Sequence, residues 1–374
     1  MRIAFDGRLL QGSLRGMGVY AASLLKAMPA RLHGHSMTVI LDGRRPSPPA
    51  DVVAGLETKT AGGPGGVVMW EQVYLPLAAR GFDLLHSPAN GAPVFAPCPV
   101  VLTLHDAIFM RRWREISAVP YPRQLAGHLY RTRVHPVAAR RASAVITVSE
   151  ASKAEIAAIF RIPAGRIAVT PEALAESFRR CEPLPKEALR SRFGLHGPFM
   201  LALGAYERRK NIPLLFRVVE KLSASSFECP TLVLAGAENL AATVYPREVR
   251  ERKIESLVRF LPYLDDSGLK RLYGSASAFL MPSRREGFGL PLLEAMSCGT
   301  PVVASDIPCH REVAGEAALL VGPDDEAGWV AAVKRVLGDQ VLRERLRRAG
   351  LDRVGAFSWD RAAQQTVAVY DGLR

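Results

Sequence analysis

The sequence predicts an α/β protein made of two halves, each built around a parallel sheet. Short apolar runs alternate with longer helical segments along all 374 residues. This alternation indicates parallel strands, because a parallel pair needs a long crossover connection between its members. A polar stretch at Thr170–Leu195, punctuated by prolines, interrupts the pattern, which restarts at Phe199. The chain is long enough for two domains of ordinary size.

The first half contains five predicted strands, at Arg2–Phe5, Met37–Leu41, Leu84–His86, Val100–Leu104 and Ala144–Val148. Helices are predicted at Val19–Met28, around Trp70–Ala79, and at Glu150–Phe160, where Ser149 suits the N-cap position. The segment Ser47–Gly66 is rich in Pro and Gly, and this composition predicts an irregular loop.

The second half repeats the same alternation. Its predicted strands are Phe199–Leu203, Thr231–Ala235, Leu257–Leu261, Ala278–Met281, Val302–Ser305 and Ala318–Val321. Its predicted helices are Ile212–Leu222, Ser267–Gly274, Pro291–Cys298, Glu326–Leu337 and Gln340–Ala349, with a last helix after Asp360.

The composition argues against several classes of protein. The residues are 48% hydrophobic and 23% charged, and no apolar run reaches the roughly 18 residues of a transmembrane helix. Met1–Asp6 has the pattern of a first strand and not of a signal peptide. The five cysteines are scattered and form no metal-binding pattern, which favours reduced thiols in a cytoplasmic enzyme.

The net charge of +13 is concentrated in the first half of the chain, where residues 1–180 hold 22 basic and 12 acidic side chains. Arg111–Arg141 carries eight arginines and one acidic residue, interleaved with Trp113, Tyr121 and Tyr130. Such a stretch suits a helix on an anionic membrane, which predicts a peripheral protein at the inner face of the cell membrane. A solvated basic surface is the alternative. We find no nucleic-acid-binding module, so nucleic acid is not an expected partner.

The most informative segment runs from Ser283 to Val303. A predicted strand leads into a glycine-containing loop, and a predicted helix follows the loop. Pro291 lies in the first turn of this helix, and Gly299 ends it. A helix N-terminus attracts phosphate, because its first N–H groups lack partners within the helix and its dipole is positive there. Glu286 precedes that N-terminus and Glu294 lies about two turns inside the helix. A nucleotide-sugar fits this pattern, since it carries hydroxyls on both sides of a diphosphate.

The spacing Glu-x7-Glu, filled in as Glu-Gly-Phe-Gly-Leu-Pro and Glu-Ala-Met-Ser-Cys-Gly-Thr-Pro-Val-Val, resembles the retaining nucleotide-sugar glycosyltransferases of family 4. The resemblance implies the GT-B fold, in which two Rossmann-like domains face each other across a cleft. It implies an acceptor-side domain at residues 1–175, completed by a C-terminal helix at 357–374, and a donor-binding domain at 195–356. A buried Rossmann-type helix in which Glu294 only pairs with a neighbour stays open as the alternative.

The resemblance also implies roles for individual residues. Arg209 and Lys210 would neutralise the β-phosphate of the departing nucleotide, although Ala205 stands where some branches of the family have an arginine. Glu286 would orient the sugar, Glu294 would hold the ribose, and His105 would lie near the sugar. The remaining donor-binding positions are in glycine loops: Gly16, Gly18, Gly287, Phe288, Gly289 and Leu290.

These features together predict hexose transfer with retention of configuration, from a nucleotide diphosphate to a glycan or polyprenyl-diphosphate-linked acceptor. Trp70-Glu71-Gln72 and His105-Asp106 resemble bacterial mannosyltransferases of polysaccharide assembly, so GDP-mannose is the first expected donor. No cofactor and no metal are expected, because the chain has no Asp-x-Asp pair and supplies cations of its own. The alternatives are a non-catalytic GT-B subunit that binds glycan, a sugar-nucleotide epimerase, or a glycan phosphorylase.

Overall fold

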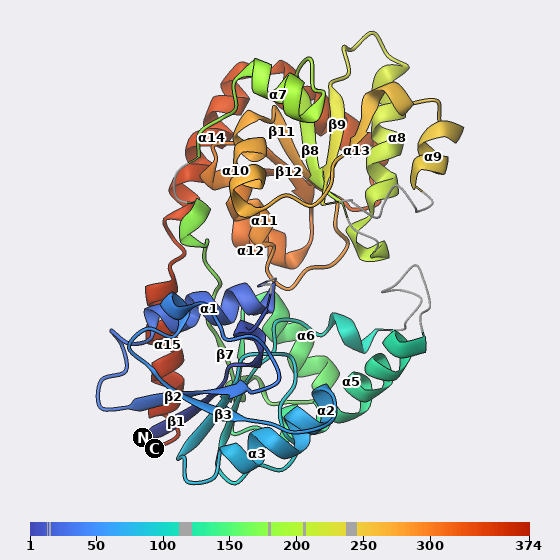
Figure 1. Cartoon of the computed structure of the whole chain (residues 1–374). Helices are drawn as coiled ribbons and strands as arrows, with labels where there is room; N and C mark the ends of the chain where they lie inside the picture. The colour runs from blue at the N-terminus through green and yellow to red at the C-terminus, as the bar shows by residue number, and fades with distance from the viewer. Residues whose placement is uncertain (13, 15, 112–121, 179–180, 205–206, 237–244) are drawn as a thin grey trace. The chain divides into compact units, whose positions relative to one another are not determined.

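The computed structural model describes every residue except 13, 15, 112–121, 179–180, 205–206 and 237–244 (Figure 1). The described residues divide into two compact units. Unit 1 contains residues 1–111, 122–173 and 357–374, and unit 2 contains residues 174–356.

Unit 1 is built on a seven-stranded parallel sheet with strand order β3-β2-β1-β4-β5-β6-β7. The interior strand β1 pairs with β2 on one side and β4 on the other, with Ile3 opposite Met37 and Leu84. The strands are β1 (Arg2–Asp6), β2 (Ser36–Asp42), β3 (Glu57–Ala61), β4 (Leu84–Ser87), β5 (Val100–Thr103), β6 (Ala144–Thr147) and β7 (Ile167–Val169). All four residues of β4 and of β5 are buried, as expected for strands with helices on both faces of the sheet.

The main helices of unit 1 are α1 (Met17–Ala27), α3 (Leu75–Ala78), α5 (Pro122–Arg141), α6 (Glu150–Phe160) and α15 (Trp359–Asp371). The short α2 (Val67–Met69) leads through a π-helical turn, Trp70–Tyr74, into α3. Ser149 caps α6, since its hydroxyl accepts a hydrogen bond from the Ser152 N–H at 3.0 Å, and this confirms the predicted N-cap.

The last helix, α15, belongs to unit 1, where it packs against α1 (Figure 1). Its Tyr370 hydroxyl lies 2.5 Å from Nδ1 of His86 in β4, and Nε2 of His86 lies 2.9 Å from the Thr103 hydroxyl in β5. Burial lowers the pKa of His86 to about 3, so the ring is neutral at ordinary pH. The two ends of the chain lie side by side in this unit, where Arg374 contacts His35.

Unit 2 is built on a six-stranded parallel sheet with strand order β10-β9-β8-β11-β12-β13. The strands are β8 (Phe199–Leu203), β9 (Thr231–Ala235), β10 (Val258–Phe260), β11 (Ala278–Met281), β12 (Val302–Ser305) and β13 (Ala318–Val321). The helices are α7 (Lys186–Phe193), α8 (Ile212–Ser223), α9 (Tyr245–Glu251), α10 (Asp266–Ser275), α11 (Leu290–Ser297), α12 (Pro308–Ala314), α13 (Glu326–Gly338) and α14 (Gln340–Val354). One buried cluster joins α8, α13 and α14 to the sheet through Phe216, Trp329 and Leu346.

The expectation of an irregular loop at Ser47–Gly66 is wrong in part. Residues Glu57–Ala61 form β3, which pairs in parallel with β2 at the edge of the sheet, with Glu57 opposite Thr38. Four of its five residues are exposed, so the strand has neither the apolar run nor the alternation by which strands are recognised. The short elements β7, α9 and α12 were likewise not expected.

Candidate functional site

The loop that leads into α11 has a backbone shape that requires glycine at one position. Gly289, the N-cap of α11, has φ = +100°, a conformation that other residues adopt only with strain. A Cβ at this position would also stand 3.3 Å from the buried His310 ring. Phe288 is buried and anchors the loop, and Pro291 occupies the first turn of the helix. The helix therefore presents a fixed N-terminus, the kind of position that binds phosphate.

Glu286 lies directly before this loop and is paired with two cations. Its Oε2 accepts a hydrogen bond from Arg209 Nη1 at 2.6 Å, and its Oε1 accepts one from Lys210 Nζ at 2.7 Å. The side chain is only 10% exposed, and such burial alone would raise its pKa. The charges of Lys210 and Arg209, together with hydrogen bonds from Lys210 and Ser283, outweigh burial and lower the pKa of Glu286 to about 2.

The structure thus brings together three of the residues selected from the sequence. Arg209 and Lys210 lie in a 3-10 turn, Arg208–Lys210, that follows β8, and Glu286 follows β11, the neighbouring strand of the sheet. The two loops are joined directly, because the Arg284 N–H donates to the Arg209 carbonyl at 2.7 Å. Both cations contact a carboxylate in this structure, whereas the sequence predicts that they contact a diphosphate.

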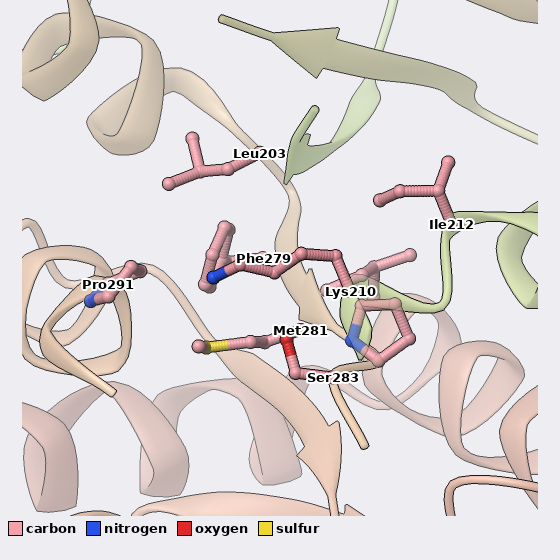
Figure 2. A pocket seen from close by; sticks show the side chains of 9 residues that line it. Leu203, Lys210, Ile212, Phe279, Met281, Ser283 and Pro291 are labelled. Carbon is pink, nitrogen blue, oxygen red and sulfur yellow. The ribbon is translucent and has the colours of Figure 1, made fainter. Parts of the chain in front are cut away.

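Lys210 also lines a small pocket at the carboxyl ends of β8 and β11. Figure 2 shows Lys210 and Ser283 on one side of it, with Pro291 of α11 on the other. The volume of the pocket is about 20 Å³, which is room for about one water molecule. Its position fits the general rule that ligands of parallel α/β sheets bind at the carboxyl ends of the strands.

Glu294 is half-buried inside α11, where its Oε2 accepts a hydrogen bond from the Tyr273 hydroxyl of α10 at 3.0 Å. Tyr273 is fully buried, and burial together with the Glu294 charge raises its pKa well above the usual value of 10.0. This contact is the pairing that was left open as an alternative. The ribose-binding role of Glu294 stays a prediction.

Two residues of this site escaped the sequence analysis. His310, in α12, is fully buried, and its Nδ1 lies 2.9 Å from the Ser305 carbonyl, so this nitrogen carries the proton. Burial lowers its pKa, and the neutral ring packs against Gly289. Arg284 hydrogen-bonds to Asn211 and pairs with Asp324. No local pattern marks either residue, because their partners are distant in the chain.

The other predicted site residues lie in unit 1. His105 follows β5 and is 7% exposed, with Nδ1 3.1 Å from Glu172 Oε1 and Nε2 3.1 Å from the Pro88 carbonyl. Burial opposes its charged form, but the Glu172 carboxylate and the Pro88 carbonyl outweigh burial and raise the pKa of His105. Both ring nitrogens are therefore engaged within the protein. Asp106 accepts a hydrogen bond from the Ile108 N–H at 2.9 Å, as in a capped turn.

Gly16, before α1, and Gly18, within it, are glycines for different structural reasons. Gly16 is the N-cap of the helix and has φ = +46°. A Cβ on Gly18 would stand 2.8 Å from the Leu9 carbonyl oxygen, so this glycine allows the helix to approach the preceding turn. Close packing within unit 1 thus accounts for Gly18, and donor binding by either glycine stays a prediction.

No cluster of three or more potential metal-ligating side chains occurs among the described residues. Within the same ranges, no helix is long and apolar enough to cross a membrane.

Two family models together match most of the chain. The model of Glycosyltransferase Family 4 matches residues 14–174, and that of Glycosyl transferases group 1 matches residues 186–353. The O-antigen chain mannosyltransferase RfbU of Salmonella typhimurium is 30% identical over 251 residues, which cover 65% of this chain and 67% of that protein. The chain belongs to glycosyltransferase family 4. Membership of this family makes it a transferase enzyme.

The chain spans 60% of the length of another relative that it matches. O-antigen chain mannosyltransferase B of Escherichia coli is 34% identical over 230 residues, which cover 61% of this chain and 60% of that protein. Two solved structures match over all of this chain. Sucrose-phosphate synthase from Thermosynechococcus elongatus has a TM-score of 0.72 and 21% identity, and 99% of its chain is covered. Anabaena HepE with UDP-glucose has a TM-score of 0.73 and 18% identity, and 100% of its chain is covered. At these identities the structures establish the GT-B fold alone, and the expectation of that fold is confirmed.

Proposed function

We propose that this family 4 member transfers a hexose, with retention of configuration, from a nucleotide diphosphate to a glycan or lipid-linked acceptor in polysaccharide biosynthesis. The observation that carries the proposal is the pairing of Glu286 with Arg209 and Lys210 beside the N-terminus of α11. Two cations and a helix dipole at one point suit a leaving group that gains negative charge.

The proposed chemistry assigns the leaving group to unit 2. As the glycosidic bond breaks, negative charge develops on the β-phosphate, where Arg209, Lys210 and the first N–H groups of α11 would stabilise it. When diphosphate engages the two cations, Glu286 loses part of its pairing and becomes available to orient sugar hydroxyls. The same carboxylate would thus hold the cations in place before the donor binds and contact the sugar afterwards.

His105 takes a modified role in this proposal. Glu172 and Pro88 engage both of its ring nitrogens, and the Glu172 carboxylate compensates the positive charge that the raised pKa favours on the ring. A proton shuttle would require one of these two hydrogen bonds to break. We therefore propose that His105 does not shuttle a proton.

We propose mannose as the sugar, with GDP-mannose as its donor. The support is similarity to proteins named O-antigen mannosyltransferases, at 34% and 30% identity over about two thirds of this chain. A panel of GDP-mannose, GDP-glucose, UDP-glucose and UDP-galactose tests this by calorimetry, with the anomeric configuration of the product read by NMR. Preferential binding of GDP-mannose and an α-linked product are expected. Preference for a UDP-sugar would refute the donor assignment.

The alternatives predict different outcomes in the same assay. An epimerase would change the sugar while it stays attached to the nucleotide, without needing an acceptor. A glycan-binding subunit would bind glycan but would neither transfer nor slowly hydrolyse the donor.

We also propose that α5 is a membrane-facing helix. Leu125, Leu129, Arg133, Val137 and Arg141 recur every four residues and so share one face of α5. All five are exposed, including Leu129 at 50%. Exposed apolar side chains next to arginines are typical of helices that lie on anionic bilayers.

Two residues of Arg111–Arg141 are unsuited to contact a membrane. Arg111 pairs with Glu155 at 3.0 Å, and the Tyr130 hydroxyl donates to the buried Glu71 at 2.7 Å, so neither is a candidate anchor. Trp113 and Tyr121 lie outside the described residues.

Sedimentation with phosphatidylglycerol vesicles tests the membrane proposal. An Arg133→Ser/Arg141→Ser variant should bind vesicles more weakly than wild type, by about 1 kcal/mol for each basic residue removed. The matched control is Arg335→Ser/Arg345→Ser, which removes two exposed arginines from unit 2. Equal loss of binding in both variants would indicate an effect of net charge alone and would contradict a role for α5.

A further inference from the structure

Two cysteines that lie far apart in the sequence meet at one carbonyl group in unit 2. Cys181 belongs to the described residues 174–178 and 181–185 at the beginning of unit 2, and Cys298 is the C-cap residue of α11. Each thiol donates to the carbonyl oxygen of Lys270 in α10, at 3.1 Å from Cys181 and 3.5 Å from Cys298. Both sulfurs thus lie within hydrogen-bond distance of one oxygen atom. The two sulfurs are therefore neighbours.

The packing around Cys181 holds its sulfur in this position. A Cβ on Gly274 of α10 would stand 2.5 Å from the Cys181 sulfur, so the glycine makes room for it. The segment is also fastened to α10 by polar contacts, in which Lys270 Nζ donates to the Ser177 carbonyl at 2.6 Å and the Ser177 hydroxyl donates to Asp266 at 3.0 Å. The packing against Gly274 and the polar contacts of Ser177 thus hold the Cys181 sulfur close to α10.

Cys181 differs chemically from the other cysteines of the chain, including Cys298, whose pKa is raised by its interaction with Cys181 and by burial. The hydrogen bond from Cys298 lowers the pKa of the Cys181 thiol, whereas burial raises the pKa of Cys98 and Cys229 to about 11 and that of Cys309 to about 12. Both members of the pair are half-buried, so a small reagent can reach them. Because the thiolate is the reactive form of cysteine, Cys181 should react first.

We propose that Cys181 and Cys298 form a modification site at which a peroxide oxidises the two thiols to a disulfide. In the first step the Cys181 thiolate attacks one peroxide oxygen, the S–O bond forms, the O–O bond breaks, and hydroxide leaves and takes up a proton as water. In the second step the Cys298 sulfur attacks the Cys181 sulfur. The S–S bond forms, the S–O bond breaks, and a second water leaves with the Cys298 proton. Hydrogen peroxide is reduced to two waters as the two thiols are oxidised.

The disulfide would join the segment 174–185 covalently to the carboxyl end of α11. The amino end of the same helix carries the Gly287–Gly289 loop. The bond would therefore close a long loop within unit 2, and closing a long loop stabilises a fold mainly by restricting its unfolded state. This inference does not depend on the proposed glycosyl transfer.

The experiment uses the full chain, reduced, freed of reductant and treated with a small excess of hydrogen peroxide. We expect two of the five thiols to be lost to Ellman's reagent and a peptide containing Cys181 linked to Cys298 in the mass spectrum. Dithiothreitol should restore both thiols. The oxidised protein should unfold at a higher temperature than the reduced protein, without change in Cys181→Ser or Cys298→Ser.

Cys229→Ser is the matched control, because Cys229 is also half-buried in unit 2 but has a raised pKa. This variant should form the disulfide as wild type does. The proposal is overturned if peroxide carries Cys181 to sulfinic acid equally with and without Cys298, if Cys181 pairs with another cysteine, or if all five thiols survive.

Discussion

The pairing of Glu286 with Arg209 and Lys210 makes a quantitative prediction about Glu286→Gln. The three side chains meet at 2.6 and 2.7 Å, and the pKa of Glu286 falls from 4.5 to about 2. A shift of this size corresponds to about 3 kcal/mol in favour of the folded protein when the carboxylate is ionised. The cations are 18% and 23% exposed, so water replaces part of the lost interaction in the variant. We expect the variant to be less stable by about 2 kcal/mol at pH 7.

The sign of the pH dependence follows from the lowered pKa. A carboxyl group with a depressed folded-state pKa contributes its full stability above its unfolded value, here 4.5, and loses it as pH falls toward about 2. The free-energy difference between wild type and variant should therefore be constant from pH 7 to about pH 5 and shrink below that. Urea unfolding of both proteins at several pH values measures this difference.

Glu316→Gln serves as the control, because Glu316 is an exposed carboxylate of the same unit and the substitution is chemically identical. It should change stability by less than about 0.5 kcal/mol at every pH. If Glu286→Gln is as stable as wild type at pH 7, or if its deficit persists unchanged below pH 4, the carboxylate is not held by the two cations and the reasoning fails.

Three further predictions concern the donor site and the C-terminal helix. Replacing Arg209 and Lys210 together with Ala should weaken nucleoside-diphosphate affinity and flatten its salt dependence, because the two cations proposed to bind the diphosphate are removed. An unchanged affinity in calorimetry would contradict this assignment. Transferase activity should survive EDTA, and a complete loss that Mg²⁺ or Mn²⁺ restores would contradict charge neutralisation by side chains. Tyr370→Phe should lower the free energy of unfolding by about 1–3 kcal/mol, because the substitution leaves Nδ1 of the buried His86 without its hydrogen-bond partner. Thermal or urea unfolding measures this difference, and a variant as stable as wild type would show that the hydrogen bond contributes nothing.

The sequence predicts that Arg209, Lys210 and Glu286 all lie near one diphosphate, but not that they pair with one another. The cations follow one predicted strand and the carboxylate follows another, and strands of a parallel sheet end at the same edge. The strand order places β8 next to β11, and this adjacency decides that the groups touch. The roles of the three side chains in catalysis stay predictions.

The contributions of His310 and Arg284 could not be predicted in the same way. His310 reaches Gly289 only because α12 folds back behind the loop, which is a tertiary contact without a sequence pattern. The edge strand Glu57–Ala61 escaped prediction for a related reason, since it is exposed and its side chains carry no hydrophobic alternation. Hydrophobic periodicity in a sequence reflects the burial of side chains, so an exposed element shows little periodicity.

The placement of α15 in unit 1 determines which fragments of this protein can be expressed in folded form. Unit 1 is a compact unit made from separate parts of the chain, since its sheet comes from residues before 174 and one of its helices from residues after 356. A fragment that stops after β7 would expose the surface on which Tyr370 and Val367 are buried. Expression of unit 1 alone should therefore succeed only when residues 357–374 are supplied, either joined through a short linker or added as a separate peptide.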